Sequence, residues 1–146
     1  MKSRCENNTA IDVAGAAETA RIAVVDDDQS VREAITSLLK SVGMAADPFA
    51  SAEEFLKSDS LKDTRCLILD VQMTGMSGLD LQDRLVSAHY KIPIIFITAQ
   101  TSDNEARTRA LKAGAIDFLH KPFSEDALLT DVYQGLQSNG EPRKGS

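Results

Sequence analysis

The sequence predicts an α/β domain with a doubly wound parallel sheet, and three observations support this fold class. Four continuous apolar runs of strand length recur along the chain, with a weaker strand-like segment after the first. Continuous rather than alternating runs are typical of parallel strands buried on both faces. Segments with helical periodicity and helix-start signals separate the runs. Alternating strands and helices of this length imply right-handed crossovers with helices on both faces of the sheet.

The predicted strands comprise four clear segments and one weak segment. The clear strands are expected at 22–25, 66–69, 94–97 and 116–119. The weak strand, at 44–49, contains two alanines and Pro48. Because proline cannot donate a hydrogen bond within a sheet, we expect this second strand at an edge.

The first predicted helix shows both an apolar face and end signals. Six apolar residues between Val31 and Val42 recur at helical spacing, which places them on one face. Ser30 and Glu33 have the spacing of a capping box, and Gly43 stands where a left-handed residue can end the helix. We therefore expect a helix that begins near Ser30 and ends before Gly43.

The other helices carry similar signals. The same Ser-x-x-Glu spacing occurs at Ser51 with Glu54, and at Ser102 with Glu105 ahead of a helix that should stop at Gly114. Two more helices are expected over 79–89, after a glycine, and over 124–138, where Phe123 and Leu128 have the spacing of a hydrophobic staple. The pattern thus predicts five strand–helix units.

Length and composition indicate one domain. The chain has 146 residues, of which 42% are hydrophobic, enough for one sizeable core. We expect a disordered leader at 1–19, the folded domain at 20–139, and a disordered tail or linker at 140–146, because both ends are polar and poor in large apolar side chains. A second folded domain is not expected.

Charge, hydropathy and cysteine content exclude several functions. A net charge of −6 disfavours direct binding to nucleic acid or to an anionic membrane. We find neither a signal-peptide pattern nor an apolar run long enough to span a membrane. The two cysteines, Cys5 and Cys66, lack metal-ligand spacing, and Cys66 is interpreted as a buried thiol. These features favour a cytoplasmic protein.

Residues able to bind a metal or a phosphate follow four of the predicted strands. Ligands of doubly wound sheets bind beyond the carboxyl ends of the strands. The residues expected there are Asp26, Asp27 and Asp28 after the first strand, Asp70 after the third, Thr98 after the fourth, and His120 and Lys121 after the fifth. Carboxylates that converge from different strands repel one another unless a cation lies between them.

These side chains suit phosphoryl transfer beside a hard cation. Carboxylate and carbonyl oxygens are ligands that Mg²⁺ prefers. Lys121 can supply a positive charge, and Thr98 a hydroxyl donor, to phosphoryl oxygens. We interpret Asp28 instead as a helix N-cap, because it directly precedes a helix. His89 and His120 are interpreted as ordinary residues, since no second histidine or cysteine is placed to share a metal with them.

Five segments in the same order give the chain a family resemblance. They are residues 24–28, 67–73, 76–78, 96–99 and 119–123, and they span about four fifths of the chain together with the intervening residues. The chain resembles response-regulator receiver domains of bacterial two-component systems, and in detail receivers that precede a helix-turn-helix output domain of the LuxR type. The resemblance implies a flavodoxin-like (βα)₅ fold with a five-stranded parallel sheet in the order 2-1-3-4-5.

The resemblance also implies the chemistry of the acidic residues. Asp70 would be the phosphoacceptor. Asp27 would bind Mg²⁺ directly, Asp26 would bind it directly or through water, and the backbone carbonyl of Gln72 would supply a further ligand. Asp70 would share the same metal. The chain would then be a phosphoacceptor switch rather than an enzyme, with self-phosphorylation and slow autodephosphorylation only.

The remaining implied roles concern the phosphoryl group and the signal. Thr98 and the backbone N–H of Ala99 would hold the phosphoryl group, Lys121 would pair with it, and the bond from Lys121 to Pro122 would be cis. Phe118 is either a plain strand aromatic or, by the resemblance, the aromatic switch residue that follows the movement of Thr98. The implied partners are a sensor histidine kinase and, on phosphorylation, a second copy of the chain.

One departure and several alternatives stay open at this point. Thr74 stands where the family usually has a proline, which places the stiffness of that loop in doubt. A haloacid-dehalogenase-like phosphatase would need a second aspartate at the position of Gln72, and a flavin protein would need a first loop without three carboxylates. The output is also open: control of transcription through a following domain, or docking by a stand-alone receiver. The residues two past Asp70 and Thr98, which are Gln72 and Gln100, partly set the phosphoryl lifetime in the family.

Overall fold

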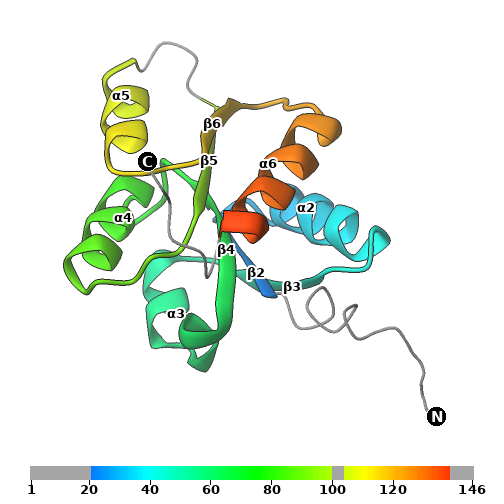
Figure 1. Ribbon diagram of the computed structural model, residues 1–146, viewed down its shortest axis with the longest axis horizontal. Helices are drawn as coiled ribbons and strands as arrows, with labels where there is room; N and C mark the ends of the chain where they lie inside the picture. Colours follow the sequence, from blue (N-terminus) through cyan, green and yellow to red (C-terminus); the bar gives the residue numbers. More distant parts are fainter. Residues whose placement is uncertain (1–20, 100–103, 139–146) are drawn as a thin grey trace.

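The computed structural model describes residues 21–99 and 104–138, which form a five-stranded parallel sheet flanked by helices (Figure 1). The strands are β2 (Arg21–Val25), β3 (Ala45–Phe49), β4 (Thr64–Asp70), β5 (Ile94–Thr98) and β6 (Asp117–His120). Their spatial order is β3-β2-β4-β5-β6, with parallel pairing throughout. In chain order this is 2-1-3-4-5, so the predicted flavodoxin-like fold is confirmed. The expected leader and tail lie outside the described residues.

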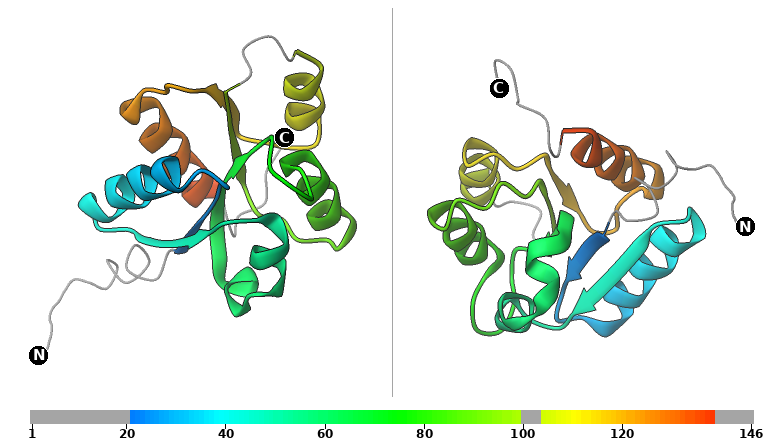
Figure 2. Two further views of the ribbon diagram at one scale, coloured as in Figure 1. Left: turned by 180° about the vertical axis from the view of Figure 1, so that it is seen from behind. Right: turned by 60° about the horizontal axis from the view of Figure 1, so that its bottom comes forward.

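The helices cover both faces of the sheet. They are α2 (Gln29–Ser41), α3 (Ala52–Lys57), α4 (Gly78–Ser87), α5 (Asn104–Lys112) and α6 (Glu125–Ser138), with a 3-10 turn at Asp59–Asp63. Helices α2 and α6 lie on one face, and α3, α4 and α5 lie on the other (Figures 1 and 2). This division is the doubly wound arrangement that the sequence predicts.

Alternate residues of each strand feed two separate cores. In β2, Ala23 and Val25 pack toward α3, α4 and α5, whereas Ile22 and Val24 pack toward α2 and α6. All four side chains are at most 1% exposed. Burial on both faces explains why the sequence shows a continuous apolar run here instead of alternation.

The second strand lies at an edge of the sheet, as predicted. β3 pairs only with β2 among the described strands, and Pro48 lies opposite Val24 in the register. Proline is tolerated there because an edge strand has one side that does not donate to a neighbour. The strand is also less buried than the central ones, with only Phe49 and no earlier residue of β3 in the core.

The start of α2 differs from the prediction. The N-cap is Asp28, whose Oδ1 accepts hydrogen bonds from the backbone N–H groups of Ser30 and Val31. Ser30 therefore lies inside the first turn, and Glu33 accepts a hydrogen bond from Gln29 rather than completing a capping box with Ser30. The capping box expected there is wrong because α2 begins at Gln29, so that Asp28 is the N-cap and Ser30 is already a helical residue. The interpretation of Asp28 as an N-cap is confirmed.

Other helix-end predictions are confirmed where the structure describes them. Gly43 has a φ of +85° and ends α2, and Gly114 has a φ of +107° after α5. Ser51 caps α3 by accepting a hydrogen bond from the backbone N–H of Glu54. Ser102 lies outside the described residues, so the third capping box stays a prediction. No helix in the described part of the chain has the length and apolar character to cross a membrane.

Gly78 allows α4 to begin very close to the end of β4. A Cβ atom on Gly78 would lie 2.2 Å from the backbone oxygen of Asp70, which no side chain can tolerate. The Gly78 N–H also donates to the backbone oxygen of Val71. Residues 71–77 therefore form a closed loop that starts directly after Asp70 and returns to it.

Candidate functional site

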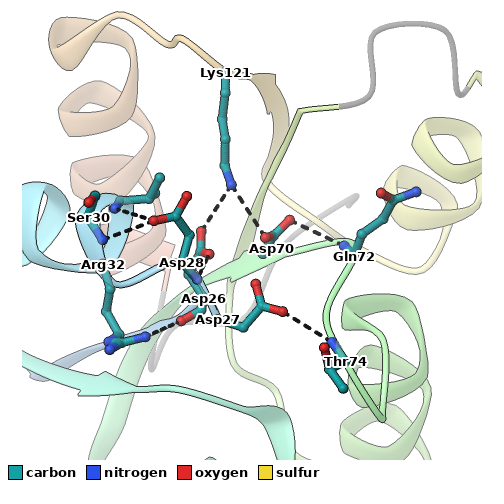
Figure 3. A network of polar contacts seen from close by, with 10 residues as sticks. Asp26, Asp27, Asp28, Ser30, Arg32, Asp70, Gln72, Thr74 and Lys121 are labelled. Carbon is teal, nitrogen blue, oxygen red and sulfur yellow. Dashed lines mark hydrogen bonds and ion pairs between the residues drawn. The ribbon is translucent and has the colours of Figure 1, made fainter.

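The residues predicted from the strand ends meet at the carboxyl edge of the sheet. Asp26 and Asp27 follow β2, Asp70 is the last residue of β4, and Lys121 follows β6 (Figure 3). One carboxylate oxygen from each of the three aspartates lies within 4.8 Å of the others. This convergence occurs because parallel strands end at the same edge, and β4 lies beside β2 in the sheet.

Asp26 and Asp70 are buried beside the ammonium group of Lys121. Asp26 is 0% exposed and Asp70 is 5% exposed. The Nζ atom of Lys121 lies 3.2 Å from Oδ2 of Asp26 and 3.4 Å from Oδ2 of Asp70. The other oxygen of Asp26 accepts a hydrogen bond from the backbone N–H of Asp28 at 2.8 Å, which fixes the side chain in the loop after β2.

The surroundings of Asp70 favour the protonated form of its carboxyl group more than water would. Burial and the charge of Asp26 raise its pKa from 3.8 to about 6, although Lys121 and a hydrogen bond from the Gln72 amide oppose this. For Lys121, burial lowers the pKa, but Asp70 and Asp26 raise it, and the net direction is upward. The site thus keeps its lysine charged and holds more negative charge than one lysine can neutralise.

The loop after β4 supplies backbone groups to the site. The N–H of Gln72 donates to Oδ1 of Asp70 at 3.2 Å, and its side chain points away from the acidic cluster (Figure 3). The N–H of Thr74 donates to Oδ2 of Asp27, also at 3.2 Å. Asp27 itself is exposed, in contrast to the two buried aspartates.

The donor set fits a hard divalent cation. Three carboxylates from two neighbouring strand ends face one another, and their only ion-pair partner in the described part of the chain is Lys121. In addition, Oδ2 of Asp26 is buried, with the Lys121 ammonium 3.2 Å away. Oxygen ligands of this kind suit Mg²⁺, which usually takes one or two carboxylates and keeps several waters.

Thr98 and Ala99 occupy the adjacent strand end. Thr98 is the last residue of β5 and is 1% exposed, and Ala99 follows it in an exposed position. The backbone oxygen of Thr98 accepts a hydrogen bond from the Lys121 N–H at 2.7 Å, which holds the ends of β5 and β6 together. The bond from Lys121 to Pro122 is cis, as the resemblance implies. Gln100 lies outside the described residues.

Phe118 is a core residue of β6. It is 2% exposed, and its ring lies 6.0 Å from the ring of Phe96 and 5.9 Å from that of His120, measured between centroids. Its backbone oxygen accepts a hydrogen bond from Arg107 of α5. Phe118 therefore connects the strand beside Thr98 to the helix that covers it.

Sequence reasoning missed two side chains that shape the site. Arg32 donates to the backbone oxygen of Asp26 at 2.6 Å, and Glu53 accepts from the Met76 N–H at 3.0 Å. These bonds and the one from Thr74 hold the two loops that carry the aspartates. Arg32 is one helical turn past the N-cap, which is a weak local signal, whereas nothing in the sequence connects Glu53 with residue 76.

Comparisons with known proteins agree with this geometry. The family model described as "Response regulator receiver domain" matches residues 22–133. Nodulation protein W of Bradyrhizobium diazoefficiens is 43% identical over 129 residues, which cover 88% of this chain and 56% of that protein. The response regulator protein TodT of Pseudomonas putida is 42% identical over 125 residues, covering 86% of this chain and 55% of that protein. The chain thus spans about half the length of these curated relatives.

Solved structures show the same similarity. The response regulator StyR superposes with a TM-score of 0.80 at 47% identity, covering 86% of this chain and 63% of that one. The structure of FixJ-N superposes with a TM-score of 0.72 at 32% identity, covering 81% of this chain and 94% of that one. Because the receiver family model covers most of the chain, the phosphatase and flavin alternatives are not supported. The chain belongs to the response regulator receiver domain family of two-component systems.

Proposed function

We propose that this receiver accepts a phosphoryl group on Asp70 from a sensor histidine kinase and changes its protein contacts as a result. The observation that carries the proposal is the placement of Asp70: it is buried at a strand end, within 4.8 Å of two further carboxylates and 3.4 Å from a lysine. A carboxylate placed in this way is held rigidly, and charge that arrives at it meets a positive group already in position.

The proposed transfer is a displacement at phosphorus. An oxygen of Asp70 forms a bond to the phosphorus atom, and the bond from phosphorus to the kinase histidine nitrogen breaks, with the electron pair leaving on that nitrogen. The product is an acyl phosphate. Asp70 must be ionised to attack, and with a pKa of about 6 it is ionised at neutral pH.

Asp26, Asp27, Asp70 and the backbone oxygen of Gln72 are the residues proposed to hold Mg²⁺. When bound, the cation supplies charge neutralisation for the carboxylates and for the incoming phosphoryl oxygens. The Lys121 ammonium holds Asp26 and Asp70 in place before the reaction. The Asp28 amide keeps the Asp26 carboxylate in one orientation.

Thr98, Ala99 and Lys121 are proposed to hold the transferred group. The hydroxyl of Thr98 and the N–H of Ala99 stand at the end of β5, which neighbours β4 in the sheet. Lys121 already reaches Asp70 and can pair with an added phosphoryl oxygen without leaving the site. These three groups and Asp70 form the proposed phosphoryl site.

Phosphorylation of the purified chain tests the proposal. Intact-mass spectrometry after incubation with acetyl phosphate and Mg²⁺ should show one phosphoryl addition. The variant Asp70→Asn should show none, whereas the matched control Asp80→Asn, an exposed acid in α4, should be labelled like wild type. Labelling of Asp70→Asn to the wild-type extent would contradict the assignment.

The proposed output surface is the face formed by α5, β6 and α6. A phosphoryl group on Asp70 should draw the Thr98 hydroxyl toward it, and Phe118, which lies beside Phe96 in the core, should repack in response. The change would bias a pre-existing equilibrium toward self-association or partner docking through this face. Relatives such as the transcriptional regulatory protein FixJ of Azorhizobium caulinodans support control of transcription as the output, and docking by a stand-alone receiver is the alternative.

Sedimentation and amide exchange with a beryllofluoride mimic test this output. We expect changes on α5, β6 and α6 and a shift toward a larger species. Because Phe118 is buried, truncation to alanine should cost about 3–5 kcal/mol, so Phe118→Leu is the better variant. Phe118→Leu should still accept phosphate but respond less. Changes confined to α2 and α3, or an unaltered response in Phe118→Leu, would contradict the switch role.

A further inference from the structure

The one exposed carboxylate of the acidic cluster is held by the loop that follows Asp70. Oδ2 of Asp27 accepts a hydrogen bond from the backbone N–H of Thr74 at 3.2 Å (Figure 3). Asp26 and Asp70 also accept backbone amides, from Asp28 and Gln72, but burial and Lys121 hold them in addition. An exposed aspartate without such a bond would sample several rotamers, so the Thr74 amide restricts Asp27 to an orientation within the cluster.

The Thr74 amide is itself held in place by a second bond of the same loop. The N–H of Met76 donates to Oε2 of Glu53 in α3 at 3.0 Å, and the same carboxylate lies 3.0 Å from where a Cβ atom on Gly75 would be. Gly75 has a φ of +85°, which lets the chain turn between these two amides. The loop therefore presents one amide to Asp27 and another to Glu53, on either side of a glycine.

This arrangement depends on a residue at position 74 that has an N–H group. Proline, which the family resemblance would lead one to expect there, has none and cannot make this bond. The threonine side chain is exposed, and the contact described for the residue uses only its backbone. The identity of residue 74 matters here through the presence of the amide proton.

We infer that the backbone N–H of Thr74 is a positioning group for the magnesium site, orienting the Asp27 carboxylate so that its other oxygen can bind the cation. The inference rests on the proposed function, in which Asp27 is a metal ligand. A carboxylate has two oxygens, so one can accept the amide while the other binds metal. Hydrogen bonds of this kind to metal ligands typically contribute about 10–100-fold to metal affinity.

Two variants at the same position separate the amide from the side chain. Thr74→Pro removes the N–H, and Thr74→Ala removes the side chain but retains the N–H. Since the chain has no tryptophan, Mg²⁺ affinity is measured by calorimetry or by NMR titration rather than by tryptophan fluorescence. We expect Thr74→Ala to bind Mg²⁺ within about twofold of wild type and Thr74→Pro to bind it about tenfold more weakly.

The outcomes distinguish this inference from the proposed function. If wild type and Thr74→Ala bind Mg²⁺ and Thr74→Pro binds it equally well or more tightly, the positioning role is wrong while the metal site stands. If neither wild type nor Thr74→Ala binds Mg²⁺, the metal site and this inference fail together. Phosphorylation of Asp70 by acetyl phosphate is measured on the same samples as an independent check of the acceptor.

A second measurement does not depend on the folding of the proline variant. In the metal-free protein, amide exchange at residue 74 should be slow in wild type and should accelerate at least about tenfold in Asp27→Ala, because the acceptor is lost. The Met76 amide, which Glu53 holds, is the internal control and should keep its protection. Equal exchange of the Thr74 amide in wild type and Asp27→Ala would overturn the inference.

Discussion

Two buried acidic groups lie at opposite ends of the sheet, and they differ in the charges beside them. At the carboxyl end, Asp70 lies between Asp26 and the ammonium of Lys121. At the amino end, Asp131 of α6 lies beside Asp117, the first residue of β6. Burial raises the pKa of both, to about 6 for Asp70 and, with the carboxyl of Asp117 adding to the effect, to about 7 for Asp131.

The difference distinguishes the proposed metal and phosphoryl site at Asp70 from the buried acid at Asp131. Lys121 and the Gln72 amide act against burial at Asp70 and favour the charged form. At Asp131 the neighbouring carboxyl and burial act in the same direction, and two carboxyl groups can hydrogen-bond to each other only if one keeps a proton. A buried aspartate alone is therefore a poor sign of function, whereas several strand-end carboxylates beside a cation are a good one.

The largest expected effect comes from removing the cation at the carboxyl end. Lys121→Met leaves Asp26 and Asp70 buried without a counter-charge, so the free energy of unfolding at pH 8 should fall by about 3 kcal/mol. At pH 5 the loss should be smaller, because Asp70 is then protonated. Urea unfolding at both pH values measures this, with exposed Lys91→Met as the control. An equal loss at pH 5 and pH 8 would contradict the electrostatic account.

At the amino end of the sheet, removing the charge of a buried carboxylate should stabilise the protein. Because the pKa of Asp131 is higher in the native state than in the unfolded chain, the stability that this group contributes is lost as the pH rises from about 4 through about 7. Asp131→Asn is neutral throughout and should be more stable than wild type by about 2 kcal/mol at pH 8, with little difference at pH 4. Thermal unfolding across this range measures it, and Asp126→Asn on the same helix is the exposed control.

Neutralising one carboxylate of the cluster should have a smaller effect on stability and a larger one on metal binding. Without Mg²⁺, Asp27→Asn should be equal to wild type or more stable by up to about 1 kcal/mol, because repulsion within the cluster is reduced. We expect Mg²⁺ to raise the melting temperature of wild type but not that of Asp27→Asn. Exposed Asp63→Asn is the control. A strongly destabilised Asp27→Asn that still binds Mg²⁺ would make Asp27 a structural residue.

The smallest expected effect comes from breaking an exposed ion pair, which separates the contribution of ion pairing from that of burial. Asp47 on the edge strand forms two hydrogen bonds with the guanidinium of Arg21, but their side chains are 21% and 42% exposed. Asp47→Asn should lower the free energy of unfolding by only about 0.5 kcal/mol, and less in high salt. Denaturant titrations at low and high salt measure this. A loss as large as that of Lys121→Met would mean that ion pairing, and not burial, dominates the comparison.

Much of the fold and of the candidate site could be predicted from local patterns. Apolar runs predicted the central strands because both faces of those strands are buried, and a strand-end aspartate predicted the site because parallel strands end at one edge. Asp28 was correctly predicted as the N-cap of α2, but the capping box of Ser30 with Glu33 was mispredicted, because Asp28 and Ser30 are both good capping residues. The roles of Thr98, Ala99 and Phe118 rest on the resemblance and stay predictions.

The sequence by itself determined the order of strands and helices, the edge position of the proline-containing strand, and the gathering of Asp26, Asp27 and Asp70. These follow from interactions between near neighbours and from the geometry common to parallel sheets. Only the tertiary structure decided that the amide of Thr74 meets Asp27, that Glu53 holds the same loop, and that Asp131 lies beside Asp117. Such contacts join residues that are far apart in the sequence, and they depend on how a loop or helix packs in the folded chain. No local pattern predicts them.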